Sequence, residues 1–334
     1  MKPFPILLLA GVCLALTACR TALPDRDSMG APRLVSVTKI WDEANHSAFT
    51  DLVRYKNKWF CTFREGERHV YGANGQIRVL ASDDGVHWES AAVITEDGID
   101  LRDPKLSVTP DNRLMLLMGG SVYEGRVLKE RQPRVSFSHD GRIWTSPQRV
   151  AEKGDWLWRV TWHKGRAYGI SYSGWKIKLL SSDDGINYRL HTNLDVPGKP
   201  NEATVRFLKN GDCVALVRRE DEDKQAWIGH SRAPYTDWHW TPCGMQVGGP
   251  NFIVLDNGAM IASGRQYRNA SWDASRTFVG RMDLQSIQSD LILPSSGDTS
   301  YPGLVWHKGT LWVSYYSSHE GKTSIYIAQV KLTP

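Results

Sequence analysis

Arginines, acidic residues and tyrosines recur along this chain at the edges of short apolar segments. The residues at these edges are Arg64, Glu65, Arg102, Asp103, Arg159, Glu202, Arg218, Arg265, Tyr301 and Tyr316. Guanidinium groups gathered in one cleft bind carboxylates, often through two parallel hydrogen bonds. The pattern therefore predicts a site for an acidic ligand, although any one of these residues alone is also typical of a solvated strand end or a structural ion pair.

A repeated pair of apolar segments would position these residues. Six times, an apolar run is followed by a two-residue turn and a second apolar run, and the first turn residues are Lys56, Asp111, Lys164, Asn210, Asn257 and Lys308. Each unit is typical of a β-hairpin, and Asn-Gly at 210 and 257 supplies the positive φ of tight turns. The steps are 55, 53, 46, 47 and 51 residues, which is the size of one four-stranded propeller blade. The chain is therefore predicted to be all-β, a six-bladed β-propeller over residues 34–334.

A propeller would bring the edge residues to one place. The innermost strands of the blades converge on the axis, so residues just before each hairpin, or just after its second strand, meet in one funnel. The sequence shows no long helical periodicity, no Gly-rich phosphate loop and no cluster of metal ligands. We therefore expect neither a cofactor nor a metal.

A second marker lies between three of the hairpins. It consists of residues 82–88 (SDDGVHW), 138–144 (SHDGRIW) and 182–188 (SDDGINY). These segments resemble the Asp-box repeat of sialidases and related propellers. Ser and Asp side chains can bond turn backbone, and glycine adopts the left-handed conformation. The boxes are expected to be structural.

The resemblance to sialidases extends over the mature chain. It rests on Phe63-Arg64, Glu202 in NEATV, Arg218 in ALVRRE, Arg265 in SGRQ and Tyr301 in TSYPGL, in the order and blade placement of that family. It implies that the three arginines hold a sugar carboxylate and that Tyr301 attacks the anomeric carbon with Glu202 as its base. Arg102, Arg159, Glu65 and Tyr316 would line the same funnel.

One part of the sialidase pattern is absent from the sequence. Sialidases carry an acid/base aspartate in the loop after the first arginine, whereas residues 65–81 contain no aspartate here. The loop offers Glu65, Glu67 and His69 instead, and Asp103 opens the next blade. His69 and Asp103 are the substitutes we expect for the missing acid/base.

Three functions fit these residues. The first is a retaining exo-hydrolase of a terminal acidic sugar such as sialic acid, acting through Tyr301. The second is an enzyme on uronate-containing glycans, such as a rhamnose-glucuronate lyase or a rhamnosidase, in which His69 or a tyrosine moves the proton. The third is a glycan-binding propeller without turnover, stacking sugars on Trp158, Trp175 or Trp272.

The N-terminus reads as a secretion signal. Lys2 precedes an apolar run over residues 6–16 that is too short to span a bilayer, and residues 16–19 (LTAC) resemble a bacterial lipobox. Residues 1–19 would then be a lipoprotein signal peptide, Cys19 the lipidated residue and residues 20–33 a tether. Because Arg20 follows the cysteine, the resemblance favours the outer membrane, on its periplasmic or surface face.

Charge and cysteine content narrow the partners. The formal net charge is +5, without any run of Lys and Arg resembling a nucleic-acid patch. Cys61, Cys213 and Cys243 cannot all pair and have no zinc-site spacing. We expect an acidic sugar or glycan as ligand, membrane association through the lipid alone, no nucleic acid, and a monomer.

Overall fold

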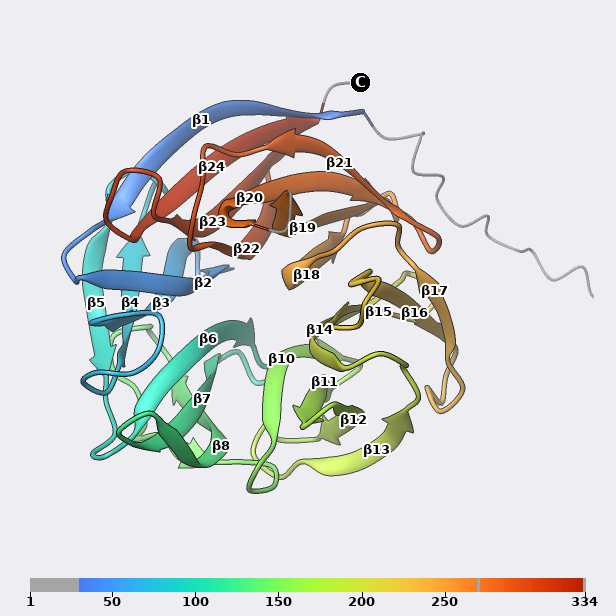
Figure 1. Ribbon diagram of the computed structural model, residues 1–334, viewed down its shortest axis with the longest axis horizontal. Helices are drawn as coiled ribbons and strands as arrows, with labels where there is room; N and C mark the ends of the chain where they lie inside the picture. The colour runs from blue at the N-terminus through green and yellow to red at the C-terminus, as the bar shows by residue number, and fades with distance from the viewer. Residues whose placement is uncertain (1–29, 269–270, 333–334) are drawn as a thin grey trace, which may run out of the picture.

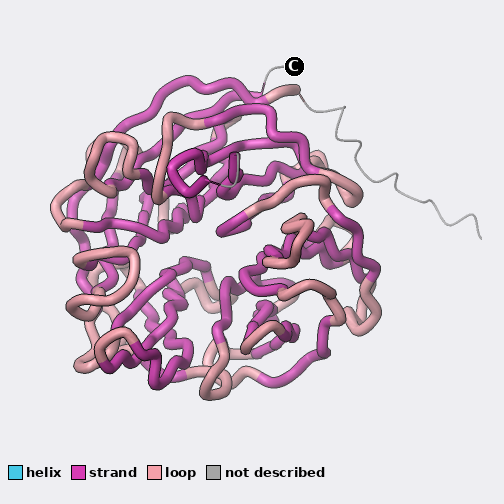
Figure 2. The backbone as a smooth tube through the Cα atoms, viewed as in Figure 1, coloured by secondary structure: helices cyan, strands magenta, loops and turns pink. Residues whose placement is uncertain are grey.

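The computed structural model describes residues 30–268 and 271–332. The predicted signal peptide with Cys19, and residues 20–29 of the predicted tether, lie outside these residues. Six four-stranded antiparallel sheets form a closed ring (Figure 1). The described chain consists of strands and loops (Figure 2), and none of its residues forms a helix long and apolar enough to cross a membrane. The predicted six-bladed β-propeller is confirmed.

The first three blades are each built from four consecutive strands, which run from the axis outward. Blade 1 contains β2 (His46–Tyr55), β3 (Lys58–Gly66), β4 (Gln76–Ser82) and β5 (Glu89–Ile94). Blade 2 contains β6 (Asp100–Val108), β7 (Leu114–Glu124), β8 (Val127–Ser138) and β9 (Gln148–Arg149). Blade 3 contains β10 (Trp156–His163), β11 (Arg166–Ser173), β12 (Lys176–Ser182) and β13 (Arg189–Leu194).

The remaining blades follow the same plan until the ring closes. Blade 4 contains β14 (Pro200–Phe207), β15 (Cys213–Arg219), β16 (Trp227–Ser231) and β17 (His239–Pro242). Blade 5 contains β18 (Gly248–Val254), β19 (Met260–Arg268), β20 (Ser271–Met282) and β21 (Ile287–Ile292). Blade 6 contains β22 (Thr299–His307), β23 (Thr310–Ser317) and β24 (Ser324–Leu332), with β1 (Pro32–Trp41) as its outer strand. Because β1 pairs with β24, the first and last strands close the ring.

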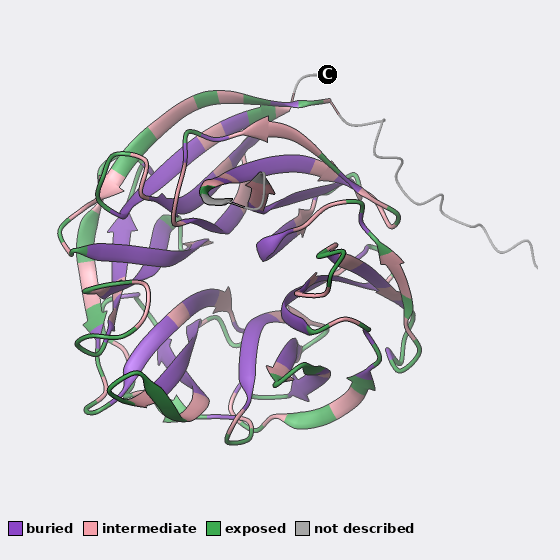
Figure 3. Ribbon diagram, in the orientation of Figure 1, coloured by how far each residue is buried: buried purple, intermediate pink, exposed green. Residues whose placement is uncertain are grey.

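The hydrophobic core is divided among the interfaces between blades. Five of the six clusters of buried apolar residues join two neighbouring sheets; the cluster around Phe60 and Leu116, for example, fills the space between blades 1 and 2. The sixth joins blades 6 and 1 and reaches Trp156 and Trp158 of blade 3 across the axis. Inner and middle strands are therefore buried on both faces, as β2 shows, whereas outer strands such as β5 and β13 are largely exposed (Figure 3). Burial on two faces explains why the hairpins read as nearly continuous apolar runs.

Every innermost strand carries a β-bulge near its first residue. The ladder is interrupted between Ala48 and Asp51, Arg102 and Lys105, Leu157 and Val160, Pro200 and Ala203, Gly248 and Asn251, and Ser300 and Gly303. A bulge leaves residues unpaired and redirects their side chains. Phe49, Asp103 and Tyr301 lie in these bulges with φ of 64°, 48° and 51°. The bulges therefore aim side chains at the axis.

The three SxDG segments lie at the opposite end of the sheets, in the turns after β4, β8 and β12. In the first, the Ser82 hydroxyl accepts the Gly85 N–H at 2.8 Å, and Asp84 accepts the N–H groups of Val86 and His87. The Trp88 indole donates to the carbonyl oxygen of Gly85 at 3.0 Å. Bonds to Ser138 and Asp140, and to Ser182 and Asp184, repeat the arrangement. These side chains hold turns and lie far from the bulges.

Candidate active site

A cavity of about 220 Å³ lies at the end where the innermost strands begin. Five predicted site residues line it: His69, Arg102, Asp103, Glu202 and Tyr301. The other lining residues are Phe49, Ser121, Tyr123, Leu128, Arg131, Trp156 and Tyr172. Charged groups and aromatic rings thus share one wall, which suits a sugar with hydroxyl edges and an apolar face.

Tyr301 and Glu202 form a close pair in this wall. The Tyr301 hydroxyl donates to Glu202 Oε1 at 2.5 Å, joining blades 4 and 6 across the axis. Glu202 Oε2 accepts the Gly249 N–H at 2.8 Å and Arg218 Nη1 at 2.9 Å. Gly249 has φ +58°, and a Cβ there would lie 2.6 Å from the Tyr301 ring. Only glycine lets the backbone of blade 5 pass this close to the tyrosine.

The surroundings set opposite protonation states for the pair. Burial alone would raise the pKa of Glu202, but the Arg218 charge and the hydrogen bonds from Tyr301 and Gly249 bring it below its usual value. Burial and the neighbouring Glu202 charge raise the pKa of Tyr301 well above 10. At rest the pair is therefore a neutral phenol bonded to a carboxylate, in which Glu202 is placed to take the phenol proton.

Asp103 faces the same cavity from blade 2. Burial raises its pKa above the usual 3.8, and the Glu202 charge acts in the same direction, against Arg102 and Lys105. Two carboxyl groups in one cavity thus have pKa values displaced in opposite directions, which is the arrangement expected of an acid and an anion that work together.

Arg218 and Arg265 lie behind the cavity wall and have partners of their own. Arg218 bonds Glu202, and its Nε donates to Glu220 at 2.5 Å. Arg265 is buried and donates to the Thr299 carbonyl at 2.8 Å and to the Tyr316 hydroxyl at 2.8 Å. Tyr316 is also fully buried. Arg218, Arg265 and Tyr316 are close enough to influence the site electrostatically, but their side chains do not line the cavity.

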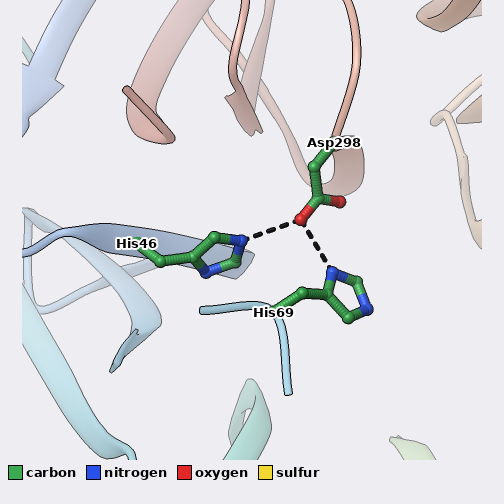
Figure 4. A group of neighbouring side chains, drawn as sticks. All are labelled: His46, His69 and Asp298. Atoms are coloured by element: carbon green, nitrogen blue, oxygen red, sulfur yellow. Dashed lines mark hydrogen bonds and ion pairs between the residues drawn. The ribbon is translucent and has the colours of Figure 1, made fainter. Parts of the chain in front are cut away.

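Asp298, which the sequence patterns did not single out, is the centre of a hydrogen-bonded cluster beside the cavity. Its Oδ2 accepts His46 Nε2 at 2.8 Å and His69 Nδ1 at 2.7 Å (Figure 4). Its Oδ1 accepts the Tyr316 hydroxyl at 2.9 Å and is 3.4 Å from Arg265 Nη2. Burial opposes ionisation, but these donors together hold the Asp298 pKa below its usual value.

The same three side chains offer ligand atoms for a cation. His46 Nε2, His69 Nδ1 and Asp298 Oδ2 lie within 4.8 Å of one another. Both histidines are hydrogen-bonded to one carboxylate oxygen, and Arg265 places a positive charge against that carboxylate. The geometry is therefore that of a hydrogen-bonded cluster, and the guanidinium disfavours a second cation there.

The predicted role of Arg64 in binding a carboxylate requires correction. Its side chain is wholly buried, and Nε and Nη2 donate to Asp100 Oδ1 at 2.9 and 2.7 Å. Its Nη1 donates to the Arg68 carbonyl at 2.8 Å. Arg64 therefore ties blade 1 to blade 2 and to the loop that carries His69, and it does not reach the cavity.

Replacing Arg64 with methionine is expected to lower the free energy of unfolding by about 3–5 kcal/mol, because the buried Asp100 would lose its closest charged partner and keep only Arg102, at 3.8 Å. Urea unfolding measures the change. Arg142→Met is the control: Arg142 pairs with Glu89 on the surface, and its loss should change stability by less than about 1 kcal/mol. Equal, small effects of both changes would show that the Arg64 pair has no structural role.

Two further predicted ligand-binding residues also have internal roles. Glu65 accepts Trp41 Nε1 at 2.7 Å, Gln76 Nε2 at 2.9 Å and Arg78 Nη2 at 2.8 Å. Arg159 Nη1 donates to Asp51 Oδ2 at 2.7 Å, and both side chains are buried along the axis. Sequence position alone did not separate these residues from the cavity lining.

Arg102 does line the cavity, but its Nη2 is bonded to the His69 carbonyl at 2.8 Å. It therefore holds the loop that carries His69. That loop places the His69 side chain at the cavity, which Asp103 also lines.

The tryptophans proposed for sugar stacking are placed differently from expectation. Trp158 is buried and packs against Tyr301 with ring centroids 5.3 Å apart. Trp175 is exposed in a turn and does not line the cavity. The side chain of Trp272 lies outside the described residues. Trp156 and Tyr172 supply the lining rings of blade 3 instead.

Two regularities of the repeat could have identified the site residues that the sequence patterns did not single out. A proline follows the bulged residue in three blades, at Asp103-Pro104, Gly249-Pro250 and Tyr301-Pro302, where no ladder donor is needed. An aspartate precedes Asp103, Trp158 and Tyr301 by three residues, at Asp100, Asp155 and Asp298. Aligning the blades on these prolines would have pointed to Gly249 and Asp298.

Comparisons with solved structures agree with this fold. A protein of unknown function from Dyadobacter fermentans superposes with a TM-score of 0.79 at 20% identity, covering 91% of this chain and all of that one. The Trypanosoma rangeli sialidase bound to the inhibitor DANA gives 0.68 at 12% identity, covering 89% of this chain and 59% of that one. An α-L-arabinofuranosidase from Fusarium graminearum gives 0.68 at 15% identity, covering 90% and 98%. No protein-family model and no curated protein matches the sequence.

These likenesses define the class of the protein. It is a six-bladed β-propeller of the kind that sialidases and an arabinofuranosidase share. At such low identities the likeness concerns the fold, so the activity must be argued from the site itself.

Proposed function

We propose that the protein is a retaining glycoside hydrolase that binds a terminal sugar in the cavity. The observation that carries this proposal is the 2.5 Å hydrogen bond between Tyr301 and Glu202 in the wall that they share with Asp103. A nucleophile bonded to its base, beside a carboxyl group of raised pKa, contains the parts that glycosidic cleavage needs.

The first step forms a covalent intermediate. As the Tyr301 oxygen bonds to the anomeric carbon, its proton passes to Glu202. The bond from that carbon to the leaving oxygen breaks, and Asp103 gives its proton to the leaving group. Arg218 and the Gly249 N–H orient the Glu202 carboxylate to accept the proton of Tyr301.

The second step returns the residues to their resting state. Asp103, now ionised, takes a proton from water as the water oxygen bonds to the anomeric carbon. The bond to Tyr301 breaks, and the phenol regains its proton from Glu202. Two displacements at one carbon leave the anomeric configuration unchanged.

The test of this function uses a panel of aryl glycosides and methyl glycosides of both anomers. We expect release of the aryl group from at least one member, with the first-formed sugar retaining the substrate's configuration by proton NMR. An inverted product would rule out the covalent intermediate. No release from a broad panel, with binding intact, would favour a glycan-binding propeller.

A lyase remains a second candidate because His69 is held by Asp298. An imidazole whose Nδ1 is bonded to a buried carboxylate is suited to abstract a proton. The lyase product is an unsaturated uronate, which absorbs in the ultraviolet. Its detection would replace the hydrolase proposal.

The pH dependence of kcat/KM is expected to have an acidic optimum. Glu202 must be ionised, and its lowered pKa places the rising limb below the usual glutamate range. Asp103 must be protonated in the first step, and its raised pKa places the falling limb above the usual aspartate range. Asp103→Asn should remove the falling limb and lower kcat by about 10²–10⁴-fold on poor leaving groups. An unchanged falling limb in this variant, lost instead in His69→Ala, would transfer the acid role to His69.

A further inference from the structure

The arginines of this site are all occupied by the protein's own acceptors. Arg64 is bonded to Asp100, Arg218 to Glu202 and Glu220, and Arg265 lies against Asp298. A cluster of guanidinium groups binds an external anion when its charge lacks an internal partner. Here each of the three has a carboxylate within ion-pair distance.

Asp298 in particular behaves as a built-in anion. Its carboxylate receives the Tyr316 hydroxyl and two imidazoles, lies against Arg265, and its side chain is 12% exposed. An acidic substrate group entering beside Arg265 would have to displace this carboxylate or lie next to it. Two carboxylates so close repel each other, and the repulsion is stronger in a site of low dielectric than in water.

The guanidinium groups in the cavity wall are turned toward main-chain carbonyls. Arg102 Nη2 donates to the His69 carbonyl at 2.8 Å, and Arg131 Nε donates to the Gly154 carbonyl at 2.9 Å. Arg131 also lies over the Tyr172 ring, 5.2 Å from its centroid. These contacts make the two arginines supports for loops and rings.

We propose that the site selects an uncharged terminal sugar, and that Asp298 excludes acidic sugars by occupying the anion position beside Arg265. The substrate class is then a neutral pentoside or hexoside, stacked on the rings of Trp156 and Tyr172. This inference rests on the proposed hydrolase function for its catalytic part, but its binding part stands alone. It replaces the acidic sugar predicted from the arginine pattern.

The first arm of the test compares substrates on the wild-type protein. Aryl glycosides of neutral pentoses and hexoses are set against aryl sialosides and aryl glucuronides. We expect cleavage within the neutral set only. Cleavage of a sialoside or glucuronide at a rate equal to or above the best neutral glycoside would overturn the proposal.

The second arm measures binding and needs no turnover. Isothermal titration with N-acetylneuraminic acid at about 10 mM should show no binding to the wild type. The affinity of Asp298→Asn for the same sugar should be higher by about tenfold or more, because this variant keeps the side-chain shape but removes the charge. Asp290→Asn is the matched control, because Asp290 is buried against Arg281 in blade 5, away from the cavity. It should bind no better than the wild type.

The two arms distinguish a failure of the hydrolase proposal from a failure of the proposed sugar specificity. If no glycoside is cleaved, the hydrolase proposal fails, while the titration still decides the specificity. Tight binding of N-acetylneuraminic acid by the wild type would overturn the role of Asp298. So would a folded Asp298→Asn variant without any gain, judged by a near-ultraviolet circular dichroism spectrum equal to that of the wild type. Should the variant not fold, the wild-type titration and the substrate panel remain decisive.

Discussion

Replacing Tyr301 with phenylalanine is expected to lower kcat by about 10⁴-fold or more, with KM changed little, because the change removes the attacking oxygen and leaves the ring in place. The ring packs against Phe49 and Trp158, so the cavity wall should keep its shape. Steady-state kinetics on the best aryl glycoside of the panel measure the loss.

Tyr315→Phe is the matched control for this variant. Tyr315 is also a buried tyrosine of blade 6, but its hydroxyl bonds the Pro294 carbonyl and does not line the cavity. Loss of this hydroxyl should lower the free energy of unfolding by about 1 kcal/mol and leave kcat unchanged. Full activity in Tyr301→Phe would remove Tyr301 from the mechanism.

Replacing Glu202 with glutamine is expected to lower kcat by about 10³-fold. The amide cannot take the Tyr301 proton, and Arg218 loses one of its two carboxylate partners. Binding of the sugar should change less than turnover, because the side-chain shape is preserved. Presteady-state kinetics should show the loss in the first step, before the leaving group is released.

Glu220→Gln supplies the comparison for that loss. Glu220 is the other partner of Arg218, is only partly buried and does not line the cavity. If Glu202 acts as a base, Glu220→Gln should lower kcat by less than about tenfold. Similar losses in both variants would mean that the charge balance at Arg218, and not proton transfer by Glu202, limits turnover.

The fold could be predicted because the hairpins recur along the sequence at the spacing of one propeller blade. Turn residues such as Lys56 and Asn210 recur at blade spacing, and the apolar runs around them match strands buried on both faces. The closing strand β1 could not be predicted in the same way. It lies before the first repeat and pairs with β24 at the far end of the chain.

The candidate site could be predicted only in part. Glu202, Tyr301, Asp103 and His69 do meet at one cavity, because the repeat places strand starts together at the axis. The bulges that turn Asp103 and Tyr301 inward are set by backbone conformation, which no hydrophobic pattern reports.

The side-chain contacts do not support the predicted arginine clamp, and the reason is electrostatic. Sequence position correctly placed Arg64 and Arg265 at strand ends near the axis, but it did not reveal Asp100 and Asp298 as their partners. These aspartates come from neighbouring blades, so the pairing is a product of tertiary structure. An arginine counted as available from sequence was already neutralised in the fold.

The most direct test of the account is to trap the covalent intermediate. A 2-deoxy-2-fluoro glycoside with a good leaving group, made from the sugar that the protein cleaves best, should form the intermediate faster than it is hydrolysed. Peptide mapping by mass spectrometry is predicted to find the sugar on the peptide containing Tyr301, bonded to the phenol oxygen. A label on Glu202 instead, or no label together with an inverted product, would contradict the mechanism.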